Sequence, residues 1–105
     1  MFKKFGTAKK KPVVIHWFKW SSYDISALKE LEVWVESFIH KTGDLVKFHD
    51  IFEFEMGRTN IRIKTLEGTS YDLPDGYIIV RGVEGEFYPC EPNIFEKTYD
   101  IKGVI

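Results

Sequence analysis

The spacing of apolar and polar residues changes along the chain, and each spacing predicts a different element. Residues 13–20 (VVIHWFKW) follow Pro12 and are β-branched or aromatic at nearly every position, which predicts a strand. Its bulky side chains would point to both faces, so we expect an inner strand or one covered on both sides. Residues 25–40 then repeat apolar side chains at steps of three and four, which predicts an amphipathic helix. The apolar positions of this helix are Leu28, Leu31, Val35 and Phe38, with Ala27, Trp34 and Ile39 beside them.

After Gly43, a natural left-handed stop for this helix, the period changes to two. Residues 48–56 alternate between apolar and polar side chains, residues 56–60 suit a turn, and residues 61–66 alternate again, which predicts a hairpin. The residues expected on its inner face are Phe52, Phe54, Ile61 and Ile63. On its outer face, acidic residues would stand opposite basic ones and help to fix the register, with Glu53 and Glu55 opposite Arg62 and Lys64.

The last third of the chain predicts short elements divided by turns. Residues 70–73 form a short strand, and the continuous apolar run at residues 77–80 predicts a buried central strand. Residues 86–90 return as a strand that Pro89 confines to an edge, and Asn93 caps a helical turn that follows. We therefore predict a single α+β domain over residues 12–105. Its amphipathic helix would pack on a curled antiparallel sheet, a half-barrel of about five to six strands, with a short C-terminal helical turn.

Charge is divided unevenly along the chain. Residues 1–11 contain five lysines and no acidic residue, a charge of +5, whereas residues 12–105 carry −6. We therefore predict a flexible basic arm over residues 1–11 in front of an acidic domain. Such an arm can contact nucleic acid, although an acidic body disfavours binding to a phosphate backbone. The candidate nucleic-acid residues are Lys3, Lys4, Lys9, Lys10 and Lys11.

Composition disfavours several classes of protein. A hydrophobic fraction of 44% with 16% aromatic residues is typical of a globular domain. A single cysteine excludes an internal disulfide framework. No apolar run approaches the ~20 residues of a membrane span, and the lysine-rich start lacks the apolar stretch of a secretory signal. We therefore expect a protein of the cytosol that has no membrane partner.

The sequence predicts no catalytic chemistry. Cys90 is the only thiol, and no spacing ties it to His16, His40 or His49, so we expect it to fill space as a small apolar side chain. The same four residues lack the spacing of a metal site. We therefore predict no catalytic residue, no metal and no cofactor.

The segment from Arg81 to Pro92 combines an arginine, aromatic residues and prolines in a turn and an edge strand. Arginine and aromatic residues dominate recognition surfaces, so we predict a surface for a partner here. Among the tryptophans, Trp20 stands beside two serines and is expected to be exposed, whereas Trp34 is expected in the core. The candidate partner-binding residues are Arg81, Glu86, Tyr88, Pro89, Cys90 and Pro92.

Three stretches resemble a family of small uncharacterised bacteriophage and prophage proteins. They are KKPVVI at residues 10–15, IKTLEG at residues 63–68 and GYIIVRGVEGEFYPCEPNIFEKTY at residues 76–99. The family opens with a strand of the type KKPVVIEA and closes with a segment of the type GDYIIKGVKGEFYPCKPDIFEKTYE. This chain has His16 where the family usually has glutamate, and Asp75-Gly76-Tyr77 in place of Gly-Asp-Tyr. Because the family has no assigned activity, the resemblance implies a phage setting and the cytoplasm of a host rather than a reaction.

We therefore expect a non-catalytic phage accessory protein that binds a host or phage protein, for example to inhibit a host defence or to redirect a host enzyme. One alternative is a protein that binds a small molecule or nucleotide in a pocket lined by aromatic residues. Another is contact with nucleic acid through the basic arm. An exposed sheet edge could also pair with a partner strand or with a second copy of the chain.

Overall fold

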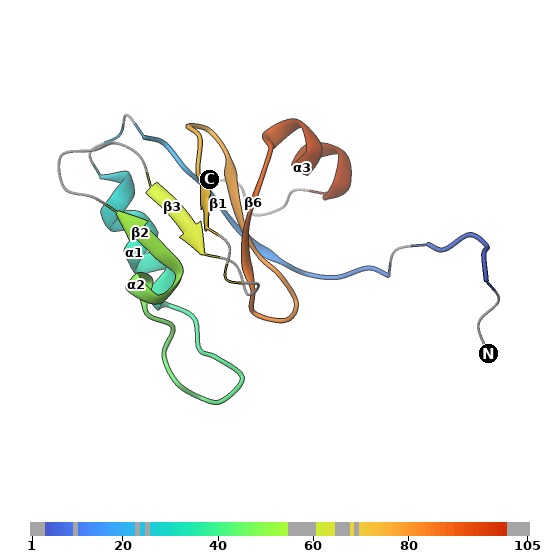
Figure 1. Cartoon of the computed structure of the whole chain (residues 1–105), viewed down its shortest axis with the longest axis horizontal. Coiled ribbons are helices and arrows are strands. Elements are labelled where there is room, and N and C mark those ends of the chain that lie inside the picture. Colours follow the sequence, from blue (N-terminus) through green and yellow to red (C-terminus); the bar gives the residue numbers. More distant parts are fainter. Residues whose placement is uncertain are drawn as a thin grey trace.

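The structure, a computed structural model, describes residues 4–9, 11–22, 24, 26–54, 61–64, 68 and 70–100. The described residues contain both helices and antiparallel strands, which confirms the α+β class (Figure 1). In chain order the elements are β1 (His16–Lys19), α1 (Ala27–Glu36), α2 (Phe48–Ile51), β2 (Phe52–Phe54), β3 (Ile61–Lys64), β4 (Ser70–Asp72), β5 (Ile78–Arg81), β6 (Phe87–Cys90) and α3 (Pro92–Thr98).

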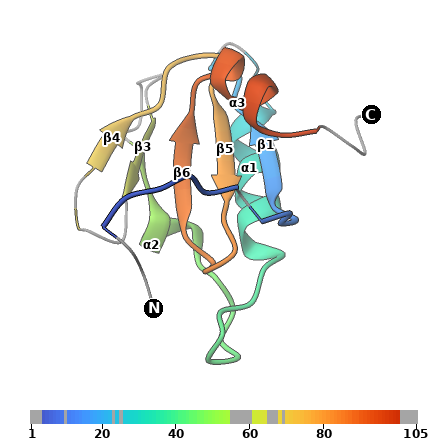
Figure 2. The same cartoon turned by 90° about the vertical axis from the view of Figure 1, so that its right-hand side faces the viewer.

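The described strands form two antiparallel sheets of three strands each, in the orders β1-β5-β6 and β2-β3-β4. The sheets meet where β3 lies beside β6 (Figure 2). The expected curled half-barrel is therefore wrong, because the two sheets stay separate. One physical reason is Pro89 in β6, which has no N–H to donate to a ladder with β3. The prediction that Pro89 places its strand at a sheet edge is confirmed.

The β1-β5-β6 sheet has a helix on each face (Figure 1). Side chains of β5 alternate between the two faces, so that Ile79 packs in one cluster with Leu31 of α1. Ile78 and Val80 pack in the other cluster with Phe95 of α3. Ile78, Ile79 and Val80 are all buried, and β5 lies between β1 and β6, which confirms the predicted central strand.

β1 lies at the edge of this sheet and is paired only with β5 in the described part of the chain. Of the two alternatives expected, an inner strand or one covered on both sides, the second is confirmed. Phe18 packs on Trp34 of α1, and Trp17 packs on Phe95 of α3. Trp20 continues the alternation onto the α1 face and is 3% exposed. Its expected exposure is wrong because the period of the strand, and not the two neighbouring serines, decides its direction.

α1 is shorter than the helix predicted over residues 25–40. It ends where the N–H of Phe38 bonds to the carbonyl of Val35 in a tight turn. The chain then forms a loop in which Ile39 pairs with Leu45, and Gly43 takes its left-handed φ of 95° within this loop rather than at the helix end. The loop extends away from the sheet at the lower end of the molecule in Figure 1.

α2 replaces the beginning of the strand predicted over residues 48–56. The rings of Phe48 and Phe52 stack at 5.1 Å across one helical turn, and both side chains are buried. The N–H of Phe48 donates to Oε2 of Glu36 at 3.0 Å, which joins this turn to α1. A spacing of four residues fits one helical turn as well as alternate strand positions, so the sequence pattern alone does not separate the two.

The hairpin of β2 and β3 is confirmed, with Phe52 opposite Ile63 and Glu53 opposite Arg62. Phe52, Ile61 and Ile63 are buried as predicted, but the expected inward position of Phe54 is wrong, because its side chain is 40% exposed at the end of β2. Oε1 of Glu53 also lies 3.8 Å from Nζ of Lys64. The predicted features that lie outside the described residues are Lys3, Lys10, Glu55, the turn over residues 56–60 and the strand end at residues 65–66.

α3 begins two residues earlier than predicted, because Glu91 and not Asn93 is its N-cap. Pro92 occupies the first helical position, where its missing N–H leaves no donor unpaired. Phe95 is the buried residue of the helix and packs on the sheet. The side of α3 that carries Phe95 therefore faces Trp17 of β1.

Candidate protein-binding site

The six residues predicted to bind a partner are divided between the two faces of the β1-β5-β6 sheet. Arg81 contacts aromatic rings on the α1 face, whereas Tyr88 and Cys90 pack in the cluster on the α3 face. Glu86 lies at the turn between β5 and β6, and Pro92 begins α3. All six are partly buried. The structure does not gather these residues on one surface, and their role in binding stays a prediction.

Arg81 is held among its neighbours by three contacts. Its guanidinium lies over the rings of Phe38 and Phe87, at 4.2 and 5.5 Å from their centroids, and Nη2 donates to the carbonyl of Ile39 at 3.1 Å. Desolvation lowers the pKa of Arg81 and the charge of Glu86 raises it, but a guanidinium with a usual pKa above about 12 stays charged. Arg81 therefore joins β5 to the end of α1.

Glu86 closes the turn between β5 and β6. Its Oε2 accepts the N–H of Glu84 at 2.9 Å, and its carboxylate lies over Gly82, where a Cβ atom would collide with it. Lys41, from the loop after α1, pairs with Glu84 at 2.6 Å, and this contact lowers the pKa of the Glu84 carboxyl. Both charges are largely exposed, so the ion pair orders the turn more than it stabilises the fold.

Tyr88 and Cys90 lie in environments that disfavour their ionised forms. The hydroxyl of Tyr88 is 3.2 Å from that of Tyr99, and burial followed by this hydrogen bond raises the pKa of Tyr88. Burial and then the charge of Glu91 raise the pKa of the Cys90 thiol. A nucleophilic cysteine needs a lowered pKa, which is the opposite of the shift at Cys90. Within the described ranges, no group of three or more His, Cys, Asp or Glu side chains could hold a metal ion.

A groove of about 530 Å³ lies beside β1 on the α3 face of the sheet. One wall is the extended segment of residues 11–15, which leads into β1, and the other is the C-terminal end of α3. Trp17 and Phe95 lie between the walls with ring centroids 5.8 Å apart. The apolar residues that line the groove are Val13, Val14, Ile15, Trp17, Phe95 and Tyr99.

Local structure explains how these side chains reach the groove. Alternation along an extended chain places Val13, Ile15 and Trp17 on one face, as the sequence predicts, and Ile15 and Trp17 pack in the α3 cluster. On the opposite wall, Phe95 and Tyr99 are one helical turn apart, with ring centroids at 5.1 Å. The groove is thus the meeting of a strand face with a helix face.

The wall formed by residues 11–15 is unusually exposed for an apolar segment. The side chain of Val13 is 42% exposed and that of Val14 is 86% exposed. Exposed aliphatic side chains next to half-buried aromatic rings are typical of an interaction site. This segment therefore supplies the candidate site with apolar surface that the fold itself does not cover.

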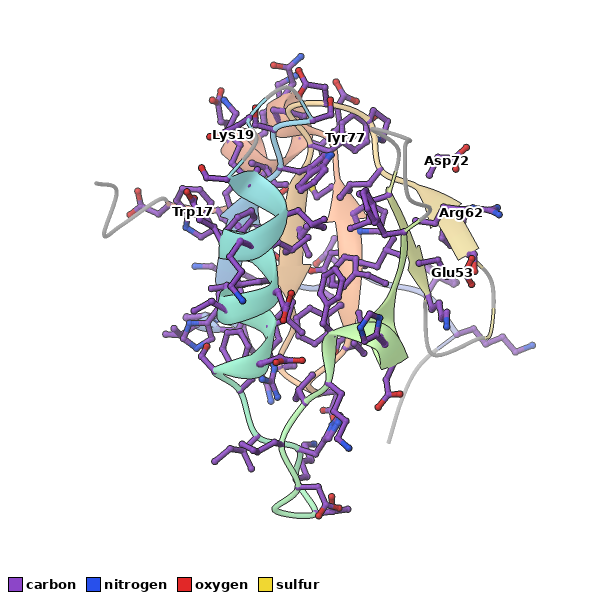
Figure 3. The ribbon with its side chains drawn as sticks, turned by 90° about the vertical axis from the view of Figure 1, so that its left-hand side faces the viewer. Trp17, Lys19, Glu53, Arg62, Asp72 and Tyr77 are labelled. Carbon is purple, nitrogen blue, oxygen red and sulfur yellow. The ribbon has the colours of Figure 1, made fainter. Side chains whose placement is uncertain are left out.

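The charged side chains of β1 and of the segment before it are basic. Lys11 and Lys19 are exposed, and no acidic residue precedes Asp24. On the other side, charges are paired, with Nε of Arg62 at 3.3 Å from Oδ1 of Asp72. Figure 3 shows Lys19 and this pair on opposite sides of the molecule. The candidate site therefore combines an apolar groove with exposed lysines on its strand wall.

No family model, curated protein or solved structure matches the chain. The resemblance to phage proteins therefore stays a prediction. None of the helices in the described ranges is both long and apolar enough to cross a membrane.

Sequence reasoning missed the groove as a site, because its walls come from opposite ends of the chain. Val13, Ile15 and Trp17 were expected to face a neighbouring layer, and Phe95 was expected to pack in a short helix. The one available signal was the excess of apolar side chains at residues 13–15, just after the basic arm. No local pattern indicates that α3 stops short of covering them.

Proposed function

We propose that this protein acts without catalysis, by binding another protein through the groove beside β1. The observation that carries this proposal is an apolar groove with two exposed valines on its rim and the half-buried Trp17 inside it, above the buried Phe95. Burial of such surface by a partner contributes about 25 cal/mol for each Å² removed from water. Aromatic anchors surrounded by smaller apolar side chains are the usual centre of a protein interface.

The resemblance to phage proteins supplies the setting of the proposal. In that setting the protein is a phage accessory factor in the cytoplasm of the host, and its partner is a host or phage protein. Inhibition of a host defence or redirection of a host enzyme are the outcomes that such binding would serve. The raised pKa of the Cys90 thiol and the structural use of Arg81 support a role that does not include catalysis.

The same aromatic groove supports a second candidate, the binding of a small molecule or nucleotide. Sites for small ligands usually bury most of the ligand surface. Here one wall is an exposed stretch of chain at residues 11–14, so the groove does not enclose a ligand on that side. An open groove bordered by extended backbone suits a polypeptide better.

The proposal predicts that a charge on the groove rim abolishes capture of the partner. Val14→Glu changes a side chain that is 86% exposed, so the fold should tolerate it, and Val33→Glu makes the same change at a 60% exposed position on α1. We expect wild type and Val33→Glu to retain the same protein from a lysate of the bacterial host, and Val14→Glu to lose it. With the purified partner, calorimetry should show that Val14→Glu weakens binding by about tenfold or more.

Equal capture by all three proteins would show that the groove is not the binding site. The same conclusion would follow if the purified partner bound Val14→Glu as tightly as wild type. Thermal unfolding followed by circular dichroism should give the same midpoint for the three proteins, which ensures that a loss of capture reports on the surface.

A further inference from the structure

We infer that the occupant of the groove is an extended segment of another protein, which adds a strand to the free edge of β1. Its apolar side chains would enter the groove, and its acidic side chains would face the lysines of the edge. This inference rests on the proposed function and adds the shape and the charge of the partner.

The backbone beside the groove is available for pairing. β1 is paired with β5 on one side, and the ladder stops at His16 opposite Arg81. In the described part of the chain, residues 12–15 form no backbone hydrogen bond and continue outward as extended chain (Figure 1). An exposed strand edge can accept a further strand, whose main-chain hydrogen bonds supply affinity. Residues 12–19 together provide an edge as long as an ordinary strand.

The side chains of this edge fit an alternating partner. Val13, Ile15 and Trp17 face the groove. A strand paired beside them would place every second side chain over the same groove, next to the aromatic rings. The remaining side chains of the partner would point to the opposite face, where His16 is exposed. The partner segment is therefore expected to alternate apolar and polar residues.

Charge selects the chemistry of the partner. Every charged side chain before Asp24 is basic, and Lys9, Lys11 and Lys19 are exposed. Among the described residues that line the groove, Asp100 is the acidic one, and it lies on the α3 wall rather than on the strand. Opposite charges across neighbouring strands are stabilising, so acidic residues at both ends of the partner segment are favoured.

A second copy of this chain fits the edge less well. Antiparallel pairing of two β1 edges would run the basic arm of one copy past Lys19 of the other. Like charges opposite one another destabilise strand pairing, and the arm offers no acidic residue to compensate. Charge therefore favours an acidic segment from a different protein.

The test uses a fluorescent synthetic peptide in which valine and isoleucine alternate with threonine, with aspartates at both ends. We expect the full chain to bind it, as measured by fluorescence anisotropy, with an affinity that falls as salt is added. A control peptide with lysines in place of the aspartates should bind about tenfold more weakly. A second control keeps the composition but groups the apolar residues together, and it should also bind more weakly.

Two proline variants test the backbone separately from the groove. Successive residues of a strand direct their N–H groups to opposite edges, so only one of Val13 and Val14 can donate to an added strand. Neither N–H has a partner in the described structure, and both residues border the groove. We expect one of Val13→Pro and Val14→Pro to weaken peptide binding about tenfold more than the other, which loses a valine side chain but no backbone hydrogen bond. Both variants should keep the melting temperature of wild type.

The remaining outcomes each overturn the inference. Equal binding by both proline variants, whether unchanged or lost, would show that side chains and not backbone groups hold the peptide. No binding of the acidic peptide, together with capture of a partner that Val14→Glu abolishes, would reject this partner chemistry and leave the proposed function standing. A dimer of the wild type that one proline variant dissociates, seen by sedimentation, would show that a second copy occupies the edge.

Discussion

The guanidinium of Arg81 connects β5 with the residues just after α1. It lies over two aromatic rings and bonds to the carbonyl of Ile39, which has left the helical hydrogen-bond pattern. A cation–π contact contributes about 0.5–2 kcal/mol and a hydrogen bond to a charged group about 1.5–3 kcal/mol. Because Arg81 is only partly buried, we expect their joint contribution near the lower end of these ranges.

Replacement of Arg81 should therefore destabilise the fold. We expect Arg81→Ala to lower the free energy of unfolding by about 2 kcal/mol, as measured by urea denaturation. Arg62→Ala is the matched control, since Arg62 makes an ion pair with Asp72 on the surface and should contribute less than about 1 kcal/mol. Equal losses for the two variants would mean that the contacts of Arg81 with the rings add no stability.

Tyr88 and Cys90 make the stability of the fold depend on alkaline pH. Folding raises the pKa of Tyr88 above its ordinary 10.0 and that of Cys90 above its ordinary 9.0, in both cases chiefly by burial. A raised pKa in the folded state means that the folded chain holds the proton more tightly. This contribution to stability is complete below the unfolded pKa values and is lost as pH rises through the folded ones.

We therefore expect the free energy of unfolding to fall as pH rises above about 9, and to fall more steeply above about 10. Denaturation with urea at a series of pH values measures this dependence. Tyr88→Phe removes the phenol that is 3.2 Å from Tyr99, so the steeper part should flatten in this variant. Identical pH dependence in wild type and Tyr88→Phe would assign the alkaline loss to other groups.

Elements with a strong local pattern could be predicted from the sequence. The burial of β5 follows from its continuous apolar run, and the burial of Phe52 and Ile63 follows from side-chain direction. The end of α1 could not be predicted, because Phe38 packs on the ring of His16 and under the guanidinium of Arg81, and both partners come from distant segments. Local periodicity carries no information about such partners.

The candidate site could also be predicted only in part, because its two walls come from elements that are distant in the sequence. The direction of Val13, Ile15 and Trp17 is a property of one strand and is predictable. Their position opposite the end of α3 depends on the order β1-β5-β6, which brings the first strand beside the last helix. Sequence predicts the faces of single elements, whereas the groove exists only where two of them meet.

At the scale of the whole molecule, a basic N-terminal segment projects from an acidic body. The molecule extends over 53 Å along its longest axis and 32 and 27 Å along the others, and the N-terminal segment points away from the body along the long axis (Figure 1). Residues 4–9 of this segment are all exposed. The basic charge of the chain is thus concentrated at one end, while the body carries the acidic excess.

This separation predicts what removal of residues 1–11 would do. The deletion removes five lysines and takes the net charge from −1 to −6, and because residues 4–9 and Lys11 are exposed, the melting temperature should not change. We expect the full chain to bind duplex DNA only at low salt, since five lysines limit the slope of log affinity against log salt to about −4.5. The shortened chain should not bind DNA in the same titration, because an acidic body repels phosphate. DNA binding that survives the deletion would place the contact on the body, where the net charge argues against it.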